Sequence, residues 1–357
     1  MKKVGIVTFH QALNYGAVLQ AFALQNYISC NFTDVQAQIV DYRCEKLSGI
    51  YTLKNSRQNA LVKGIKAAHF LLKKAKFDAF TKKYIALSRK QYTAQTIGEA
   101  DGEYDLFLTG SDQVWNPHLS DSDLNYLLQF TSPDKRYSYA ASIGLGEIPQ
   151  ELQNVYKALL QDYKGISVRE ADAKEVLKAI GLQNEIRVHI DPTLLLDRQN
   201  WIDVCKGVSP RKKGYVLVYS VTYSEDLLCK AVEFAKDKGL DVLYIGQRTK
   251  NKDVHYIPSI KIDRLLALFR DAEYVFENSF HGTVFSVIFH RKFYALLPFS
   301  DGRNSRTTNL LSILELQSRA ILDNIGCGVD WNKVDAKLQE ERRASQEYLE
   351  WVIKHEN

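Results

Sequence analysis

Short runs of apolar residues alternate along the chain with longer segments in which apolar residues recur every three or four positions. The continuous runs, such as 4–9 and 215–220, predict buried strands of a parallel sheet. The periodic segments, such as 16–29 and 225–238, predict helices with one apolar face. Because strand and helix alternate nearly throughout, the pattern predicts an α/β protein with mostly parallel sheets covered by helices.

A polar stretch at 209–214, with one proline and three basic residues, interrupts this alternation. We therefore expect two Rossmann-like domains, 1–208 and 209–330, which is an ordinary division for a chain of 357 residues. A charged helix in 331–357 would follow and pack back on the first domain. The first strand–helix–strand series lacks the G-x-G-x-x-G fingerprint, so we expect no dinucleotide cofactor.

Composition adds few constraints to this picture. The chain is 45% hydrophobic and 25% charged, as is typical of a globular protein. Its five cysteines are scattered and form no C-x-x-C pair, so the sequence favours a reducing, cytoplasmic location over a disulfide framework or a zinc site. No apolar stretch approaches the roughly 18 residues of a membrane span.

The charge is concentrated in residues 54–90, which hold eleven Lys and Arg residues and one Asp. We expect one or two amphipathic helices here, forming a basic insertion in the first domain. The common explanation of such a segment is a solvated basic face over a packed apolar stripe. The sharper one is contact with anionic lipid head groups at the inner face of a membrane. Nucleic acid is not expected as a partner, because no known binding module is present.

The most informative stretch is 274–293. A short apolar run, 274–276, predicts a strand, the polar residues 277–279 predict a turn, and 282–289 predicts a buried helix. His281 would stand where this helix begins, at the carboxyl end of a strand, where ligands of open α/β sheets bind. Asn278 and Ser279 can cap the helix, and its positive end suits an anion such as a phosphate.

Polar residues also follow the other predicted strands: His10, Ser111, Asp112, Ser142, Arg169 and Asp191. Such a series is what a binding site at one edge of a sheet requires, although loop edges are polar in any protein. Asn14 and Gly16 can form a turn that approaches a ligand closely, or an ordinary turn. Trp115 offers a face for stacking on a sugar ring, or belongs to the core.

The stretch S-F-H-G-T-V-F-S-V-I-F-H-R-K, from Ser279, resembles the C-terminal signature of the polysaccharide pyruvyl transferases. The likeness recurs, in the order of that family, at 14–17, 110–116, 142–144, 167–170 and 191–193. The resemblance implies the two-Rossmann plan of the GT-B glycosyltransferases, with a cleft between the domains. It also implies transfer of the enolpyruvyl unit of phosphoenolpyruvate onto a sugar as a ketal, with no cofactor and no metal.

For the donor, the resemblance gives His281 an acid/base role and Arg169 a role in binding phosphate or carboxylate. Many family members carry an arginine two residues before this histidine, where this chain has Ser279. Arg303 and Arg306 are candidates to replace that guanidinium, because they follow the next predicted strand. With Asn278 and Ser279, they complete the expected donor site.

For the acceptor, we expect a glycan or a lipid-linked sugar, with galactose as one candidate, in cell-surface or capsular polysaccharide synthesis. The residues expected to contact it are Asn14, Gly16, Ser111, Asp112, Trp115 and Ser142. Two alternatives stay open: a glycosyltransferase of GT-B type that uses a nucleotide sugar, and a non-catalytic glycan-binding protein that kept the fold.

Overall fold

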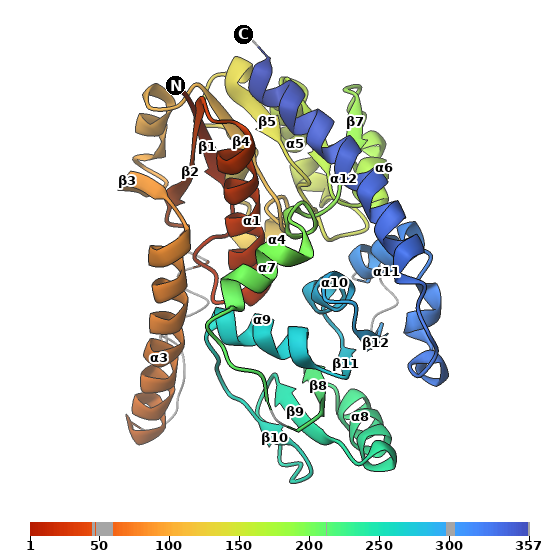
Figure 1. Ribbon diagram of the computed structural model, residues 1–357. Helices are drawn as coiled ribbons and strands as arrows, with labels where there is room; N and C mark the ends of the chain where they lie inside the picture. Colours follow the sequence, from red (N-terminus) through yellow and green to blue (C-terminus); the bar gives the residue numbers. More distant parts are fainter. Residues whose placement is uncertain (45–46, 48–59, 212, 298–303, 356–357) are drawn as a thin grey trace. The chain divides into compact units, whose positions relative to one another are not determined.

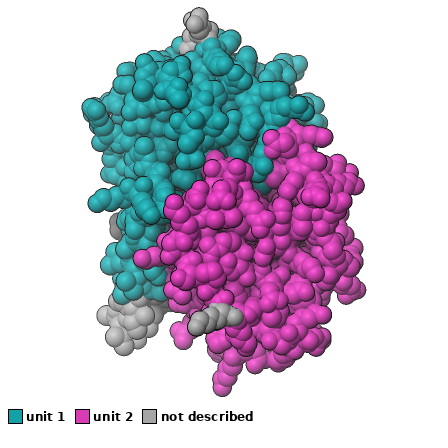
Figure 2. Space-filling view, in the orientation of Figure 1, with its two compact units in different colours: residues 1–195, 341–357 teal, residues 196–340 magenta. Residues whose placement is uncertain are grey.

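The computed structural model describes residues 1–44, 47, 60–211, 213–297 and 304–355, and the side chains of 60–66 are left aside. The chain forms two compact units (Figures 1 and 2). Unit 1 comprises Met1–Leu195 with Glu341–Asn357, and unit 2 comprises Leu196–Glu340.

Unit 1 is built on a parallel sheet with strand order β3-β2-β1-β4-β5. Two further parallel strands, β6 and β7, continue from β5 through bridges at Tyr137–Gly165 and Ala141–Val168. The bounds are β1 Lys2–Val7, β2 Val35–Tyr42, β3 Leu87–Tyr92, β4 Leu106–Thr109, β5 Arg136–Ser138, β6 Ile166–Val168 and β7 Ile186–Val188. The strands β2 and β3 are added on one side of β1, and β4 and β5 on the other. The topological switch point of unit 1 therefore lies between β1 and β4.

The helices of unit 1 fill the connections between these strands. They are α1 Tyr15–Asn31, α3 Ala60–Tyr84, α4 Pro117–Ser120, α5 Gln150–Leu160 and α6 Ala171–Ala179. Short 3₁₀ helices occur at Ile97–Gly102, Leu124–Leu127, Pro133–Lys135 and Pro192–Leu194. Helix α1 is buried on nearly all sides, and Asn14 caps it by accepting the backbone N–H groups of Gly16 and Ala17.

Unit 2 repeats the same plan, with parallel strands in the order β10-β9-β8-β11-β12. Its strands are β8 Tyr215–Tyr219, β9 Asp241–Ile245, β10 His255–Tyr256, β11 Tyr274–Glu277 and β12 Lys292–Ala295. Its helices are α7 Arg198–Cys205, α8 Glu225–Lys238, α9 Ile262–Asp271, α10 Phe280–Ile288 and α11 Ser305–Ile313, with 3₁₀ turns at Gln317–Ala320 and Leu322–Asn324. The switch point of unit 2 lies between β8 and β11.

The division between the units differs from the expected one at 208/209. Helix α7, expected in the first domain, belongs to unit 2. Its fully buried Trp201 packs edge-on against Phe285 of α10, with ring centroids 5.1 Å apart. The polar stretch at 209–214 therefore connects two elements of one unit. Burial of a tryptophan, and not the polarity of a loop, decides where this unit begins.

The final helix, α12 (Trp331–Lys354), begins in unit 2 and ends in unit 1. Within unit 1, the Tyr348 hydroxyl donates to the carbonyl of Ser138 at 2.9 Å. Lys2 Nζ of β1 donates to the carbonyls of Ile353 and His355, each at 2.8 Å. These bonds attach the last turns of α12 to the first unit.

The basic segment 54–90 is not wholly helical. Residues 54–59 lie outside the described part, α3 ends at Tyr84, and β3 follows. The predicted helix is thus wrong for 87–90, because Leu87 and Gln91 pair with Ile39 and Asp41 of β2. Pairing at the edge of a sheet overrides a local helical pattern. In the described part of the chain, no helix has both the length and the apolar character that crossing a membrane would require.

Candidate functional site

The turn between β11 and α10 carries His281. Glu277 ends the strand, Ser279 is the N-cap residue, and His281 is the second residue of the helix. The expected cap is wrong in detail, since the Ser279 side chain makes no capping bond. Instead, Glu277 Oε2 accepts the Ser279 N–H at 2.6 Å, and Glu277 Oε1 accepts the Thr283 hydroxyl at 2.6 Å. A carboxyl group at the end of the strand therefore holds the first turn of the helix by accepting these two bonds.

Glu277 is fully buried, and Gly282 leaves room for it. A Cβ atom at position 282 would lie 2.9 Å from both Cβ and Oε2 of Glu277. Burial raises the pKa of Glu277 to about 8, although its bonds with Thr283 and Ser279 act in the opposite direction. The sequence placed Glu277 in this turn but gave it no role. Its only signal was an acidic residue at the end of an apolar strand.

Asn278 joins the segments that follow the two strands flanking the switch point of unit 2. Its Oδ1 accepts the N–H of Val221 at 3.1 Å, and its Nδ2 donates to the carbonyl of Thr222 at 2.6 Å. The expected role of Asn278 as a helix cap is therefore replaced by a bracing role. His281, 8% exposed, lies directly after this brace, at the edge of the sheet where a ligand is expected.

Of the two arginines expected to replace the missing guanidinium, Arg303 lies outside the described residues. Arg306, expected in a loop, is instead the second residue of α11 and is partly buried. Helix α11 packs against α10, the helix that carries His281. Arg306 is therefore the candidate whose element lies near the His281 helix within unit 2.

Arg169 occupies a different setting, at the carboxyl end of β6 in unit 1. Its Nη1 lies 2.7 Å from Asp191 Oδ2, its Nε 3.3 Å from Glu170 Oε1 and its Nη2 3.9 Å from Asp112 Oδ1. Only 4% of Arg169 is exposed. Burial alone would lower the pKa of this guanidinium, but Glu170, Asp191 and Asp112 raise it above its ordinary value.

Hydroxyl groups complete this cluster. Ser142 donates to Glu170 Oε1 at 2.6 Å and Thr193 to Asp191 Oδ1 at 2.6 Å, while Ser111 donates to the carbonyl of Ala140 at 2.7 Å and lies 3.3 Å from Asp191 Oδ2. Ser111 and Ser142 are fully buried. We expected these two serines to contact the acceptor, and the structure instead uses them to hold carboxylates around Arg169.

Three other residues expected at the acceptor are also explained by the fold. Trp115 is fully buried and donates its Nε1–H to the carbonyl of Tyr126 at 3.2 Å, so its ring is core and not a stacking surface. Gly16 is buried in α1, and Asn14 is exposed and caps that helix. Asp112 is the remaining one. Its side chain is 15% exposed, and its φ of 66° lies in the left-handed region.

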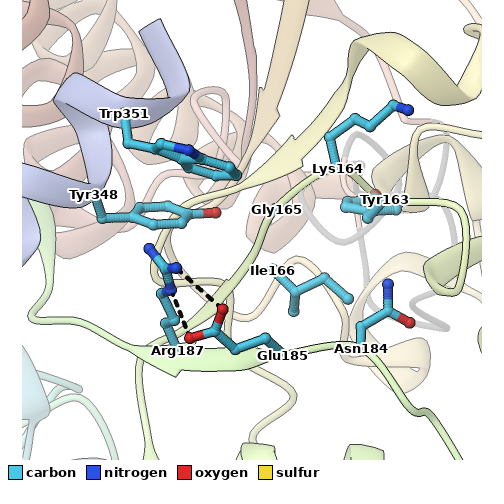
Figure 3. A pocket seen from close by; sticks show the side chains of 9 residues that line it. All are labelled: Tyr163, Lys164, Gly165, Ile166, Asn184, Glu185, Arg187, Tyr348 and Trp351. Carbon is cyan, nitrogen blue, oxygen red and sulfur yellow. Dashed lines mark hydrogen bonds and ion pairs between the residues drawn. The ribbon is translucent and has the colours of Figure 1, made fainter. Parts of the chain in front are cut away.

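A small cavity of about 140 Å³ lies at the other edge of the unit 1 sheet (Figure 3). It is bordered by residues at the amino ends of β6 and β7 and by α12, whereas Arg169 follows the carboxyl end of β6. Arg187 lies below the Tyr348 ring, 5.7 Å from its centroid, and pairs with Glu185 at 3.0 Å. This cavity marks where α12 packs on unit 1, with Trp351 above Tyr348.

No group of three or more His, Cys, Asp or Glu side chains is placed to hold a metal ion in the part of the chain that the structure describes. The carboxylates of unit 1 instead surround a guanidinium. Titratable groups thus gather at the carboxyl ends of strands in both units: Arg169 with three carboxylates in unit 1, and His281 with Glu277 in unit 2.

Comparison with known proteins identifies the family. The family model for polysaccharide pyruvyl transferase matches residues 14–298, which include both clusters. The chain belongs to this family. The predicted relationship is therefore confirmed. A search of curated proteins finds no match.

Solved structures show the fold of this pyruvyl transferase family member. UDP-GlcNAc 2-epimerase of Neisseria meningitidis, bound to UDP-GlcNAc, matches at a TM-score of 0.51 and 9% identity, covering 99% of this chain and 100% of the epimerase. MnaA of S. aureus, solved with UDP, matches at a TM-score of 0.52 and 9% identity, covering 99% and 96%. A protein of Listeria monocytogenes named as a putative UDP-N-acetylglucosamine 2-epimerase matches at a TM-score of 0.51 and 12% identity, covering 99% of this chain and 96% of that protein. The expected GT-B-like α/β fold with two Rossmann-like domains is confirmed.

Proposed function

We propose that this protein transfers the enolpyruvyl group of phosphoenolpyruvate onto two hydroxyls of a sugar, forming a pyruvate ketal during polysaccharide synthesis. The observation that carries the proposal is the family match over residues 14–298. In support, His281 lies on the first turn of α10, beside a helix N-terminus that favours a phosphate.

The proposed reaction conserves its protons. A proton adds to the methylene carbon of phosphoenolpyruvate, and one sugar hydroxyl attacks the neighbouring carbon. A second hydroxyl attacks the same carbon and phosphate leaves, so the two hydroxyl protons end on the methyl group and on phosphate. His281 is our candidate for moving a proton, since imidazole titrates near neutrality.

Arg306 is our candidate for holding the donor anion, because a guanidinium binds phosphate and carboxylate through paired N–H groups. Arg169, to which the family resemblance gave that role, already contacts Asp191, Glu170 and Asp112. We assign it a positioning role, in which it keeps these carboxylates together at the edge of the sheet.

The donor is tested by thermal-shift titration of the whole chain with phosphoenolpyruvate and with UDP in parallel. A ligand that binds only the native state raises Tm by mass action. We expect stabilisation by phosphoenolpyruvate that is reduced in Arg306→Met and His281→Ala. Stabilisation by UDP alone would instead support a nucleotide-sugar glycosyltransferase, since two of the similar structures hold UDP or UDP-GlcNAc.

We also propose that the acceptor is lipid-linked and that α3 contacts an anionic membrane surface. Leu71 and Leu72 are 61% and 63% exposed on this helix, and Lys82 and Lys83 are exposed beyond them. Exposed leucines can enter the head-group region while lysines attract anionic lipids.

Sedimentation with phosphatidylglycerol-containing vesicles tests this contact. We expect binding that weakens as salt rises and falls severalfold in Leu71→Ser/Leu72→Ser. Ile321→Ser is the matched control, because Ile321 is 55% exposed in unit 2. Equal recovery with uncharged phosphatidylcholine vesicles, or no loss in the double variant, would contradict the proposal.

A further inference from the structure

Unit 1 contains a cavity of about 290 Å³. The residues that line it include none of those expected to contact the acceptor. It lies where β1 and β2 end, against one side of α3. Residues that line it include His10, Gln11, Ala12, Arg43, Phe70, Lys74, Phe77 and Asp78. The carboxyl edge of an open α/β sheet is where ligands bind, and the volume lies near the lower end of the range for ligand pockets.

One wall of the cavity is fixed by the buried carboxylate of Asp41. His10 Nε2 and Gln11 Nε2 each lie 3.0 Å from Asp41 Oδ1, and Arg43 Nη2 donates to Asp41 Oδ2 at 3.0 Å. Asp41 is 7% exposed and His10 4%. Three polar side chains that line the cavity are therefore held in place by one anchor, as the groups of a preorganised binding site are.

The opposite wall comes from α3 and is partly aromatic. Phe77 is 3% exposed and packs on Tyr15 at a centroid distance of 4.9 Å, and Phe70 is partly exposed about two turns earlier. Lys74 pairs with Asp78 at 2.5 Å. An aromatic wall facing fixed hydrogen-bonding groups suits the apolar face and the hydroxyls of a sugar ring.

The charged side chains around this cavity do not favour an anionic ligand. The two cationic side chains, Arg43 and Lys74, each have a carboxylate partner, Asp41 and Asp78. The Lys74–Asp78 pair is solvent-exposed and weak, but Arg43 is held by the buried Asp41, so an anionic ligand would compete with a carboxylate already in place. A neutral, polyhydroxylated ligand can use the paired groups as they stand.

We propose that this cavity binds a neutral sugar ring of the acceptor glycan, with Gln11, Arg43 and Asp78 contacting hydroxyls and Phe70 contacting the ring face. This rests on the proposed function for the identity of the substrate. Sugar binding and donor binding are separate measurements, so failure of one is distinguishable from failure of the other.

The test is saturation-transfer NMR on the whole chain with methyl glycosides of galactose, glucose, mannose and N-acetylglucosamine. We expect at least one to bind, and its affinity to fall tenfold or more in Ala12→Leu, which fills the cavity, and in Phe70→Ala, which removes a wall. Ala79→Leu is the matched control, because Ala79 is exposed on α3 and does not line the cavity. Phosphoenolpyruvate should not displace the sugar.

Three results would overturn the proposal. The first is that none of the four glycosides binds a chain whose melting curve shows it to be folded. The second is that a bound glycoside keeps its affinity in both cavity variants. The third is displacement by phosphoenolpyruvate, which would make the cavity part of the donor site. If phosphoenolpyruvate itself fails to bind while the sugar effects hold, the cavity proposal stands and the proposed donor is wrong.

Discussion

The two units share one strand order, yet they place different chemistry at the carboxyl ends of their strands. In unit 1, the Arg169 guanidinium is surrounded by Asp191, Glu170 and Asp112, so carboxylates outnumber the cation. In unit 2, His281 follows a buried carboxyl group, Glu277, at the start of a helix. The first setting is electronegative and suits ligands that donate hydrogen bonds, such as sugar hydroxyls. The second has the positive end of a helix and suits an anion.

The largest expected effect is the loss of activity when His281 is replaced, because this residue of unit 2 is the candidate for proton transfer. Since general acid/base groups contribute about 10²–10⁴-fold, His281→Ala should reduce ketal transfer by that factor. Phosphate release from phosphoenolpyruvate in the presence of the acceptor measures it. His255→Ala, an exposed histidine of the same unit, is the control and should keep activity. Full activity in His281→Ala would remove this residue from the mechanism.

Next in size is the effect of Arg169 on unit 1. Arg169→Met leaves buried carboxylates without their cation, and breaking a buried ion pair in this way costs about 3–5 kcal/mol. Urea denaturation measures the loss, and Arg187→Met, whose partner Glu185 is exposed, should change stability far less. If Arg169→Met keeps its stability but no longer binds phosphoenolpyruvate, Arg169 is a donor-binding residue, and the contrast between the units is wrong.

A smaller, pH-dependent effect is expected at Glu277. The folded protein keeps this proton up to about pH 8, whereas the ordinary pKa is 4.5. Its contribution to stability is therefore fully present below pH 4.5 and is lost as pH rises through about 8. Glu277→Gln resembles the protonated form, so its stability should fall less than that of the natural chain across this range. Melting curves between pH 5 and 9 test this, and parallel pH dependence in the two chains would contradict it.

The smallest effect concerns Ser279, whose side chain is partly exposed and makes no capping bond. Ser279→Arg adds a cation beside His281 and leaves the backbone bond to Glu277 in place. A charged hydrogen bond at a partly exposed site should tighten phosphoenolpyruvate binding by about tenfold. Ser279→Met, similar in length and uncharged, is the control. Equal affinity in both variants would show that this position does not face the donor.

Much of the fold could be predicted from the sequence because its strands are continuous apolar runs. The prediction for 225–238 matches α8, and 16–29 lies within α1. Strand β3 was missed because only its pairing with β2 distinguishes it from the basic helix before it. The domain boundary was misplaced because burial of Trp201, a tertiary fact, outweighs a polar loop.

The candidate site could be predicted from the sequence only in part. The turn holding His281 follows from a local pattern of strand, polar turn and apolar helix. The partners of Ser111, Ser142 and Arg169 come from strands far apart in sequence, and no local pattern could show that these side chains bind one another. The role of Glu277 depends on the space left by Gly282, which is equally invisible in the sequence.

Helix α12 has a consequence for the order in which the protein matures. Unit 2 is one continuous segment, 196–340, whereas unit 1 is completed by 341–357. During synthesis from the N-terminus, the bonds of Ser138 and Lys2 with α12 must wait until the intervening unit has been made. The first-made unit is therefore the last to be finished, and until then the surface that receives Tyr348 and Trp351 is uncovered.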